Sequence, residues 1–156
     1  MADVRYWLMK SEPDVYSSED LQKDGRTHWD GVRNHRARNF LRDEIKVGDR
    51  VLYYHSNMKP SAVVGLATVV RDGYPDFTAW DPDSPHPDPR SPEDNPRWYM
   101  VDITADEPLP TPVTLHEAKA NPKLANMMLV RNPRLSVQPV LKEEWDEVLR
   151  MAGMKP

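Results

Sequence analysis

The distribution of proline limits where regular structure can form in this 156-residue chain. Ten of the 16 prolines lie between Pro75 and Pro112, and six of these lie between Pro82 and Pro96. Proline has no backbone N–H and a fixed φ, so it is rare in helix interiors and central strands. The sequence therefore predicts a long irregular segment, and a loop of this length in a compact domain is usually functional or disordered.

Regular elements are expected on both sides of this segment. Apolar, β-branched and aromatic residues predict strands at 5–10, 50–56, 62–70, 97–104 and 135–140, with a bulge at Gly65. Capping residues and helical spacing predict short helices that begin near Ser17, Asn34 and Thr114, a helical turn at 124–129 and a final helix around Trp145. The sum is a single α+β domain, expected over 1–156, with five to six strands flanked by short helices. Its sheet could curl into a small barrel.

Composition excludes several classes of protein. The chain is 38% hydrophobic and 29% charged, and no apolar run approaches the roughly 20 residues that span a bilayer. The N-terminus lacks the basic region of a signal peptide, so we expect an intracellular, cytoplasmic protein with no membrane partner. The absence of cysteine excludes disulfides, thiolate metal ligands and a cysteine nucleophile.

Charge is unevenly distributed along the chain, although its net value is −4. Residues 26–50 contain seven Lys/Arg and four Asp/Glu, a local net charge of +3. Residues 71–108 contain three Lys/Arg and ten Asp/Glu, a local net charge of −7. This asymmetry is compatible with one basic, polyanion-binding surface on an acidic protein.

Residues 29–39 combine an aromatic ring, a turn and the start of a helix. Trp29 precedes an Asp-Gly turn at Gly31, and Asn34 has the side chain of an N-cap. Several arginines follow in the helix. The stretch can therefore hold an anion at the start of the helix, next to a ligand ring stacked on Trp29. The alternative is a turn between a strand and a helix, with Trp29 in the core and a solvated basic face.

Catalytic patterns are sparse. The five histidines lack metal-ligand spacing, with His86 and His116 resembling surface residues, and the glycines form no phosphate loop. We therefore expect no metal, no cofactor and no enzymatic activity. Lys10 and Glu12 alternate at the end of a strand, where a desolvated lysine beside a carboxylate could act in acid–base catalysis. An ion pair at the strand end is the alternative that we prefer.

Seven motifs together closely resemble the EVE domain family: YWLMKSEP (6–13), WDGVRN (29–34), ARNFLR (37–42), YHSN (54–57), VGLA (64–67), NPRW (95–98) and RLSVQPV (134–140). The resemblance covers nearly the whole chain in order. It implies a PUA-like fold, a curled β-barrel flanked by helices, related to the YTH, SRA and ASCH domains. It also implies binding of a modified nucleobase, such as a methylated or oxidised cytosine, flipped out of DNA or RNA by a monomer.

The resemblance nominates a set of ligand-binding residues: Trp7, Lys10, Ser11, Trp29, Val32, Arg33, Asn34, Asn39, Tyr53, His55, Ser56, Trp98, Ser136 and Gln138. Trp29 and Trp98 are expected to stack on the base, while Gln138, Ser56 and Asn39 read its edge. Arg36 and Arg38 are expected to contact the nucleic-acid backbone, with a solvated face as the alternative. Capping or turn formation is expected to explain at least one of these polar side chains, with Asn34 and Asn39 as the first candidates.

Two other functions remain open. Some ASCH-type relatives use a lysine and a glutamate to hydrolyse an acylated cytidine. Because Lys10 and Glu12 could form such a pair, this hydrolysis is one alternative. A module that binds a free nucleoside or a similar heteroaromatic molecule is the other alternative.

Overall fold

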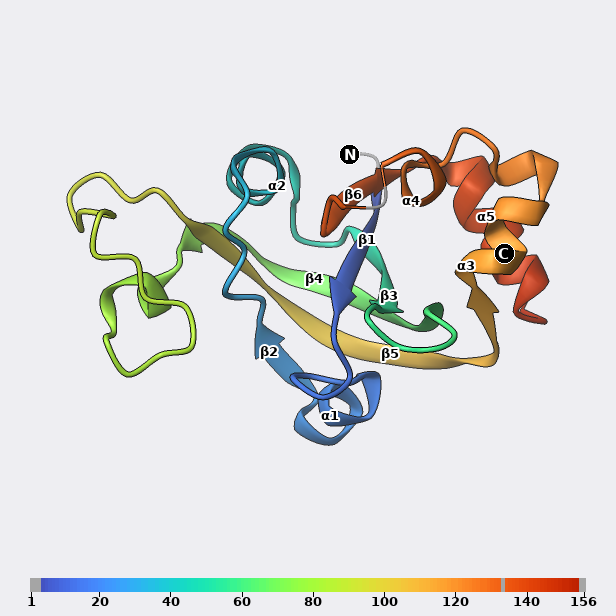
Figure 1. The fold of residues 1–156 in the computed structure, drawn as a ribbon, viewed down its shortest axis with the longest axis horizontal. Coiled ribbons are helices and arrows are strands. Elements are labelled where there is room, and N and C mark those ends of the chain that lie inside the picture. Colours follow the sequence, from blue (N-terminus) through green and yellow to red (C-terminus); the bar gives the residue numbers. More distant parts are fainter. Residues whose placement is uncertain (1–3, 133, 155–156) are drawn as a thin grey trace.

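The computed structural model describes residues 4–132 and 134–154, so the expected domain limits at 1 and 156 lie outside the described residues. One six-stranded sheet organises the chain, in the order β2-β5-β4-β3-β1-β6 (Figure 1). The strands are β1 (Tyr6–Ser11), β2 (Arg26–His28), β3 (Arg50–His55), β4 (Ala62–Pro75), β5 (Tyr99–Thr114) and β6 (Val137–Val140). The helices are α1 (Ser18–Asp24), α2 (His35–Asn39), η1 (Phe40–Glu44), η2 (Phe77–Trp80), α3 (Leu115–Ala120), η3 (Pro122–Leu124), α4 (Met128–Arg131) and α5 (Lys142–Met151).

A long crossover joins the two parallel strands of the sheet. β1 pairs parallel with β3, whereas the other neighbouring strands pair antiparallel. Parallel neighbours need a crossover connection, and here it carries α1, β2, α2 and η1. The turn at Gly31 lies on this crossover, so the sheet fixes both of its ends.

The sheet is curled but not closed. Its edges are β2 and β6, and no pairing joins them among residues 4–132 and 134–154. Pairing between β4 and β5 shifts register on both sides of Gly65, which confirms the expected bulge. The expected α+β fold, with six strands and short helices, is therefore present in an open form.

The two longest strands extend beyond their predicted ends. β4 continues from 70 to Pro75, and β5 continues from 104 to Thr114 through three prolines. Gly65 pairs with Pro108 and Val63 with Val113, so residues 109–112 bulge opposite a single residue. Pro110 and Pro112 lie in this bulge, which explains how a strand tolerates them.

Local signals located most helices correctly. Ser17 and Asp20 form a capping box on α1, Thr114 and Glu117 form one on α3, and Gly153 follows α5 with φ +84°. The expected helix after Asn34 is α2 followed by a π-helical turn, η1, in which the Ile45 N–H donates to Phe40 O. The turn expected at 124–129 is instead divided between η3 and α4.

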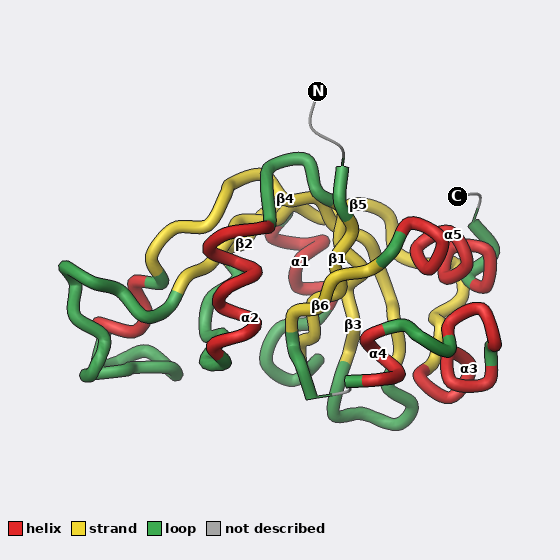
Figure 2. Tube along the Cα trace, turned by 90° about the horizontal axis from the view of Figure 1, so that it is seen from above, coloured by secondary structure: helices red, strands yellow, loops and turns green. Residues whose placement is uncertain are grey.

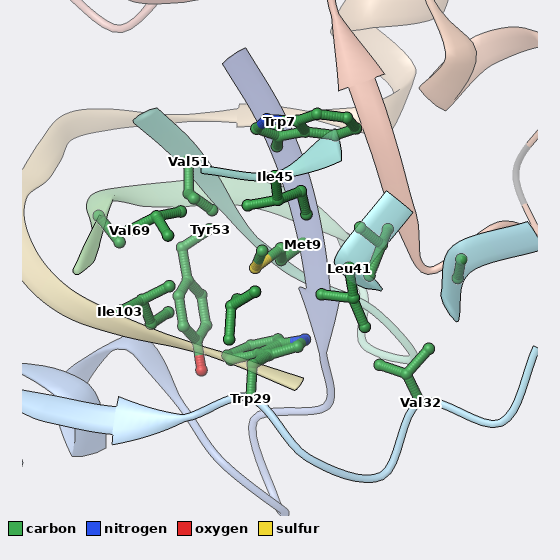
Figure 3. Packing of buried hydrophobic residues seen from close by; sticks show 14 of the residues in the cluster. Trp7, Met9, Trp29, Val32, Leu41, Ile45, Val51, Tyr53, Val69 and Ile103 are labelled. Atoms are coloured by element: carbon green, nitrogen blue, oxygen red, sulfur yellow. The ribbon is translucent and has the colours of Figure 1, made fainter. Parts of the chain in front are cut away.

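Two apolar clusters lie on opposite faces of the sheet. Alternate residues of β1 supply both, because Trp7 and Met9 belong to one cluster and Leu8 to the other. All three side chains are fully buried, which for Leu or Met contributes about 1.5–3 kcal/mol each. Figure 3 shows the first cluster, with Trp29 at its lower edge beside Tyr53.

The ends of the molecule differ. Helices α3, α4 and α5 gather at one end and pack on the second cluster (Figure 2). The proline-rich segment, defined here as residues 76–98, projects at the opposite end. No helix in the described part of the chain is long and apolar enough to cross a membrane.

Candidate nucleic-acid interface

A pocket of about 230 Å³ opens between the two edges of the sheet. One wall comes from β2 and the turn after it, with Thr27 and His28 at the strand edge. The other wall comes from the end of β1 and from Ser136, which precedes β6. The full lining is Lys10, Ser11, Val15, Tyr16, Thr27, His28, Trp29, Asp30, Gly31, Val32, Arg33, His86 and Ser136. The pocket therefore lies at the end of β1, between the turn that follows β2 and the approach to β6.

Trp29 is both a core residue and part of the pocket wall. Its N–H donates to Val101 O at 2.7 Å, which extends the pairing of β2 with β5. Its ring meets the Tyr53 ring edge to face at 5.4 Å, and only 8% of the residue is exposed. The Tyr53 hydroxyl donates to Tyr16 O at 2.7 Å and so holds Trp29 from behind. The core placement of Trp29 is therefore confirmed, and its place in the pocket wall leaves stacking on a base as a prediction.

Arg33 attaches the proline-rich segment to the pocket. Its guanidinium pairs with Asp76 at 2.9 Å and also donates to His86 O and the Thr78 hydroxyl. Asp76 additionally accepts from the N–H of Gly31 at 2.8 Å. Burial would raise the pKa of Asp76, but the hydrogen bonds from Thr78, Arg33 and Gly31 outweigh it and hold that pKa below its usual value. The segment is thus ordered by the turn at Gly31.

His86 lies at the pocket and not on the open surface. A Cβ added at Gly31 would meet the His86 imidazole at 2.6 Å, and the φ of Gly31 is +80°. Only glycine lets the ring approach this closely. His86 is therefore half-buried beside the turn and not fully exposed as expected, because residues 76–98 fold back over the turn. No feature of the sequence connects positions 31 and 86.

Six of the nominated ligand-binding residues line the pocket: Lys10, Ser11, Trp29, Val32, Arg33 and Ser136. The Lys10 N–H donates to Ser136 O at 2.9 Å, so β1 and the approach to β6 are joined at the pocket. The Lys10 ammonium lies 5.5 Å from the centre of the Tyr54 ring. Burial lowers the pKa of Lys10 from its ordinary value.

Trp7 and Gln138 lie in the interior, away from the pocket. Both are 0% exposed. The Trp7 indole donates to Asp49 at 2.9 Å, and the Gln138 amide donates to Asn132 O at 2.8 Å and Leu135 O at 2.9 Å. Gln138 pairs with Leu8 across the sheet and so shares its face. These placements argue against the expected ligand contacts, and in particular against Gln138 reading a base edge.

Tyr53 and His55 support the pocket from the sheet. Tyr53 is 1% exposed and lies behind Trp29. His55 is 6% exposed, and its Nε2 accepts from the N–H of Ser18 at 2.9 Å. Burial lowers the pKa of His55, with Glu19 opposing this weakly. Neither residue lines the pocket, so their expected contact with a ligand finds no support in the lining.

One of the two asparagines acts as the expected cap, whereas Asn39 makes no side-chain cap hydrogen bond. The side chain of Asn34 accepts from the Ala37 N–H at 3.0 Å, which confirms the N-cap. Asn39 accepts from the Arg38 guanidinium at 2.8 Å, and Arg38 also donates to Arg97 O. Arg36 is exposed on α2. None of these four arginine and asparagine side chains on 34–39 lines the pocket.

Trp98 is separated from the pocket by Arg33. Its ring stacks on His35 at 5.0 Å, and the Arg33 guanidinium lies 5.5 Å from its centre. Its indole N–H donates to Asp88, and only 6% of the residue is exposed. These contacts argue against the expected base sandwich between Trp29 and Trp98. Ser56 lines a neighbouring pocket with Lys10, Ser11 and Ser136.

Several lining residues were not nominated from the sequence. Asp30 and Thr27 bring a carboxylate and a hydroxyl, and Val15 and Tyr16 bring apolar surface. The WDGVRN motif contained Asp30, so the signal for that residue was present. Among the described residues, no group of three or more His, Asp and Glu could hold a metal ion.

The EVE domain profile matches residues 5–151. The chain belongs to the EVE domain family. Human thymocyte nuclear protein 1 is 41% identical to this EVE domain over 97% of the chain and 75% of that protein. A hypothetical protein from Leishmania major has a TM-score of 0.93 and 48% identity, over 97% of this chain and 96% of that one.

Two other solved structures bear on this EVE domain. Human THYN1 protein, solved in complex with DNA containing 5-methylcytosine, has a TM-score of 0.91 and 41% identity, over 97% and 99% of the two chains. An ASCH protein from Zymomonas mobilis has a TM-score of 0.56 over 94% and 98% of the chains. Because the two sequences are only 13% identical, this structural similarity shows a shared fold and nothing about function.

Proposed function

We propose that this EVE domain binds DNA that carries 5-methylcytosine and holds the extruded base in the pocket beside Trp29. The observation that carries the proposal is the pocket between β2 and β6, with an aromatic wall and polar groups on both sides. The human relative solved with 5-methylcytosine-containing DNA supports this choice of ligand. Its fold matches this chain over nearly the whole length.

The size and lining of the pocket suit a single base. Its volume of about 230 Å³ lies below the ~300–1,000 Å³ of pockets for drug-sized ligands. Trp29 offers indole surface, and Val15 and Val32 offer methyl groups to a methylated ring. Contact with one added methyl group is worth only about 1–3 kcal/mol, or roughly 10–200-fold in affinity.

Hydrogen bonds must then identify the base as a cytosine. The Asp30 carboxylate accepts hydrogen bonds only, which matches the exocyclic amine of cytosine. Lys10 donates hydrogen bonds only, which matches the carbonyl and ring nitrogen acceptors on the same base. Thymine carries a carbonyl where cytosine carries its amine, so Asp30 would repel it. Asp30 therefore replaces Gln138 as the candidate for reading the base edge.

Duplexes that differ at one position test the proposal. We expect calorimetric titration to show tighter binding when the duplex contains 5-methylcytosine than when it contains cytosine, by about 10–200-fold. Affinity should also fall as salt rises, because phosphate contacts release counterions. Equal affinities for the two duplexes would contradict the proposal.

Matched variants locate the site. Val15 lines the pocket and is 67% exposed, whereas Leu141 is 63% exposed and precedes α5 at the far end of the molecule. Val15→Glu should weaken binding because its carboxylate faces the DNA, and Leu141→Glu should not. Equal effects would place the DNA elsewhere.

Two further ligands separate the alternatives. Salt-independent binding of the free nucleoside, with no gain from a duplex, would favour a small-molecule module. Release of the acyl group from an acylated cytidine, followed by chromatography, would favour the amidohydrolase. Glu12 does not line the pocket beside Trp29, so this pocket does not bring together the lysine and glutamate that the second alternative needs.

A further inference from the structure

A second pocket, of about 480 Å³, adjoins the pocket beside Trp29. Lys10, Ser11 and Ser136 line both, so the end of β1 and the approach to β6 form a shared wall. From this wall the second pocket extends toward α3 and α4, where Leu115 and Leu129 line it. A polymer that places one unit beside Trp29 therefore has space for a connected unit.

The second pocket is too large for a lone base and has a mixed lining. Its volume is about 480 Å³, compared with about 230 Å³ beside Trp29. Leu115 and Leu129 offer apolar surface, while Ser56, Asn57 and Ser61 offer hydroxyl and amide groups. A sugar with an attached base needs both kinds of surface.

Two cations line this pocket. Arg134 is exposed on the loop before β6, and Lys10 belongs to the shared wall. Glu12 lines it as well, so the lining carries one net positive charge. A phosphodiester between two nucleotides would pass the shared wall, within reach of a cation from either pocket. Arginine suits this contact because its planar group bonds two phosphate oxygens.

We propose that this second pocket binds the nucleotide that neighbours the extruded base on the same strand, with Arg134 contacting the phosphate between them. The inference rests on the proposed function, because it needs the methylated base beside Trp29. It assigns to Arg134 a role that is separate from recognition of the base itself. Recognition then covers two connected nucleotides.

Short ligands test this directly. Wild-type protein is titrated with 5-methyl-2′-deoxycytidine and with two dinucleotides that add one nucleotide on its 5′ or 3′ side. We expect one dinucleotide to bind at least tenfold more tightly than the nucleoside, because a hydrogen bond to a charged group is worth about that factor or more. The preferred dinucleotide gives the direction of the strand.

Arg134→Ala should remove most of this gain and leave the nucleoside affinity unchanged. For a duplex, it should also reduce the slope of log affinity against log salt by about one. Arg131→Ala is the matched control, because Arg131 is an exposed arginine on α4 that hydrogen-bonds Asn126 and does not line the pocket. Circular dichroism confirms folding of both variants.

The outcomes distinguish the two proposals. If wild-type protein binds the nucleoside but neither dinucleotide binds more tightly, the second pocket does not hold a nucleotide. If a gain is present and Arg134→Ala preserves it, the role of Arg134 is wrong. If the nucleoside and the methylated duplex both fail to bind, the proposed function is wrong and this inference fails with it.

Discussion

Individual side chains at the pocket divide into those that face a ligand and those that hold the turn. Asp30 and Lys10 line the pocket with opposite charges. Arg33 also lines it, but its guanidinium is occupied by Asp76 and by the His86 carbonyl. Under the proposed function, selectivity depends on the first two side chains, and the third preserves the shape of the pocket.

Asp30→Asn tests the assignment of base reading. The amide keeps the size of the side chain but adds donors where cytosine also donates. We expect binding of the methylated duplex to weaken by about tenfold or more, in line with an unmatched buried polar group. Preference over a thymine-containing duplex should narrow in the same calorimetric titrations. An unchanged preference would remove Asp30 from the base edge.

His55 predicts a pH dependence of stability. Its Nε2 accepts from Ser18, and its pKa lies below 6.5 because the ring is buried. The unfolded chain therefore takes up a proton more readily than the folded one, and stability is lost as pH falls from 6.5 through the folded pKa. Urea unfolding at pH 7.5 and 5.5 should show this loss. The loss of unfolding free energy between the two pH values should be smaller in His55→Gln, because glutamine does not titrate. It should be unchanged in the control His116→Gln, because His116 is exposed.

At the scale of helices and strands, the sequence correctly predicted the features that depend on residues close together in the chain. Capping boxes at Ser17 and Thr114 and the N-cap at Asn34 depend on contacts within three residues, and all three formed. β2 escaped prediction because its three residues carry no pattern and pair only through β5. The extension of β5 through its prolines depended on the extra residues 109–112 in that strand, which the expected bulge at Gly65 did not locate.

The same distinction applies to the candidate site. Trp29 and Arg33 were found because one motif contains them both. Gln138 was predicted at the ligand but lies in the interior. Its register opposite Leu8 in the pairing of β1 with β6 decides which face of the sheet its side chain occupies. His86 could not be found, because its contact with Gly31 joins positions 55 residues apart through a docked loop. Sequence motifs thus located the pocket, while topology decided its lining.

At the scale of the whole molecule, the arginines of α2 lie close to the acidic segment, because Arg38 donates to Arg97 O. Residues 76–98 are held against the turn by the ion pair of Arg33 with Asp76. Exposed Arg36 and half-buried Arg38 lie on the adjoining α2. The acidic side chains of residues 76–98 repel a polyanion. We therefore expect phosphates to be attracted only to a small basic rim formed by Arg36 and Arg38, and not to the whole surface.

Charge reversal on α2 tests this rim. Arg36→Glu with Arg38→Glu should weaken binding of methylated and unmethylated duplexes about equally, because phosphate contacts carry no sequence information. The salt slope should fall by about two for two lost contacts. Lys119→Glu with Lys142→Glu, on α3 and α5, makes the same change in net charge at the other end of the molecule. Equal effects of the two pairs would mean that net charge alone steers the DNA.

The unpaired edges of the sheet also bear on the rate of binding. No ladder hydrogen bond joins β2 to β6 in the described residues, so none has to break before a ligand enters. If the pocket holds an extruded base as proposed, the slow event belongs to the DNA, where unstacking a base costs a few kcal/mol. Association rate constants should be higher for single strands and mismatched duplexes than for fully paired duplexes. Dissociation rate constants should be similar for all three ligands, because the same base is bound in each complex.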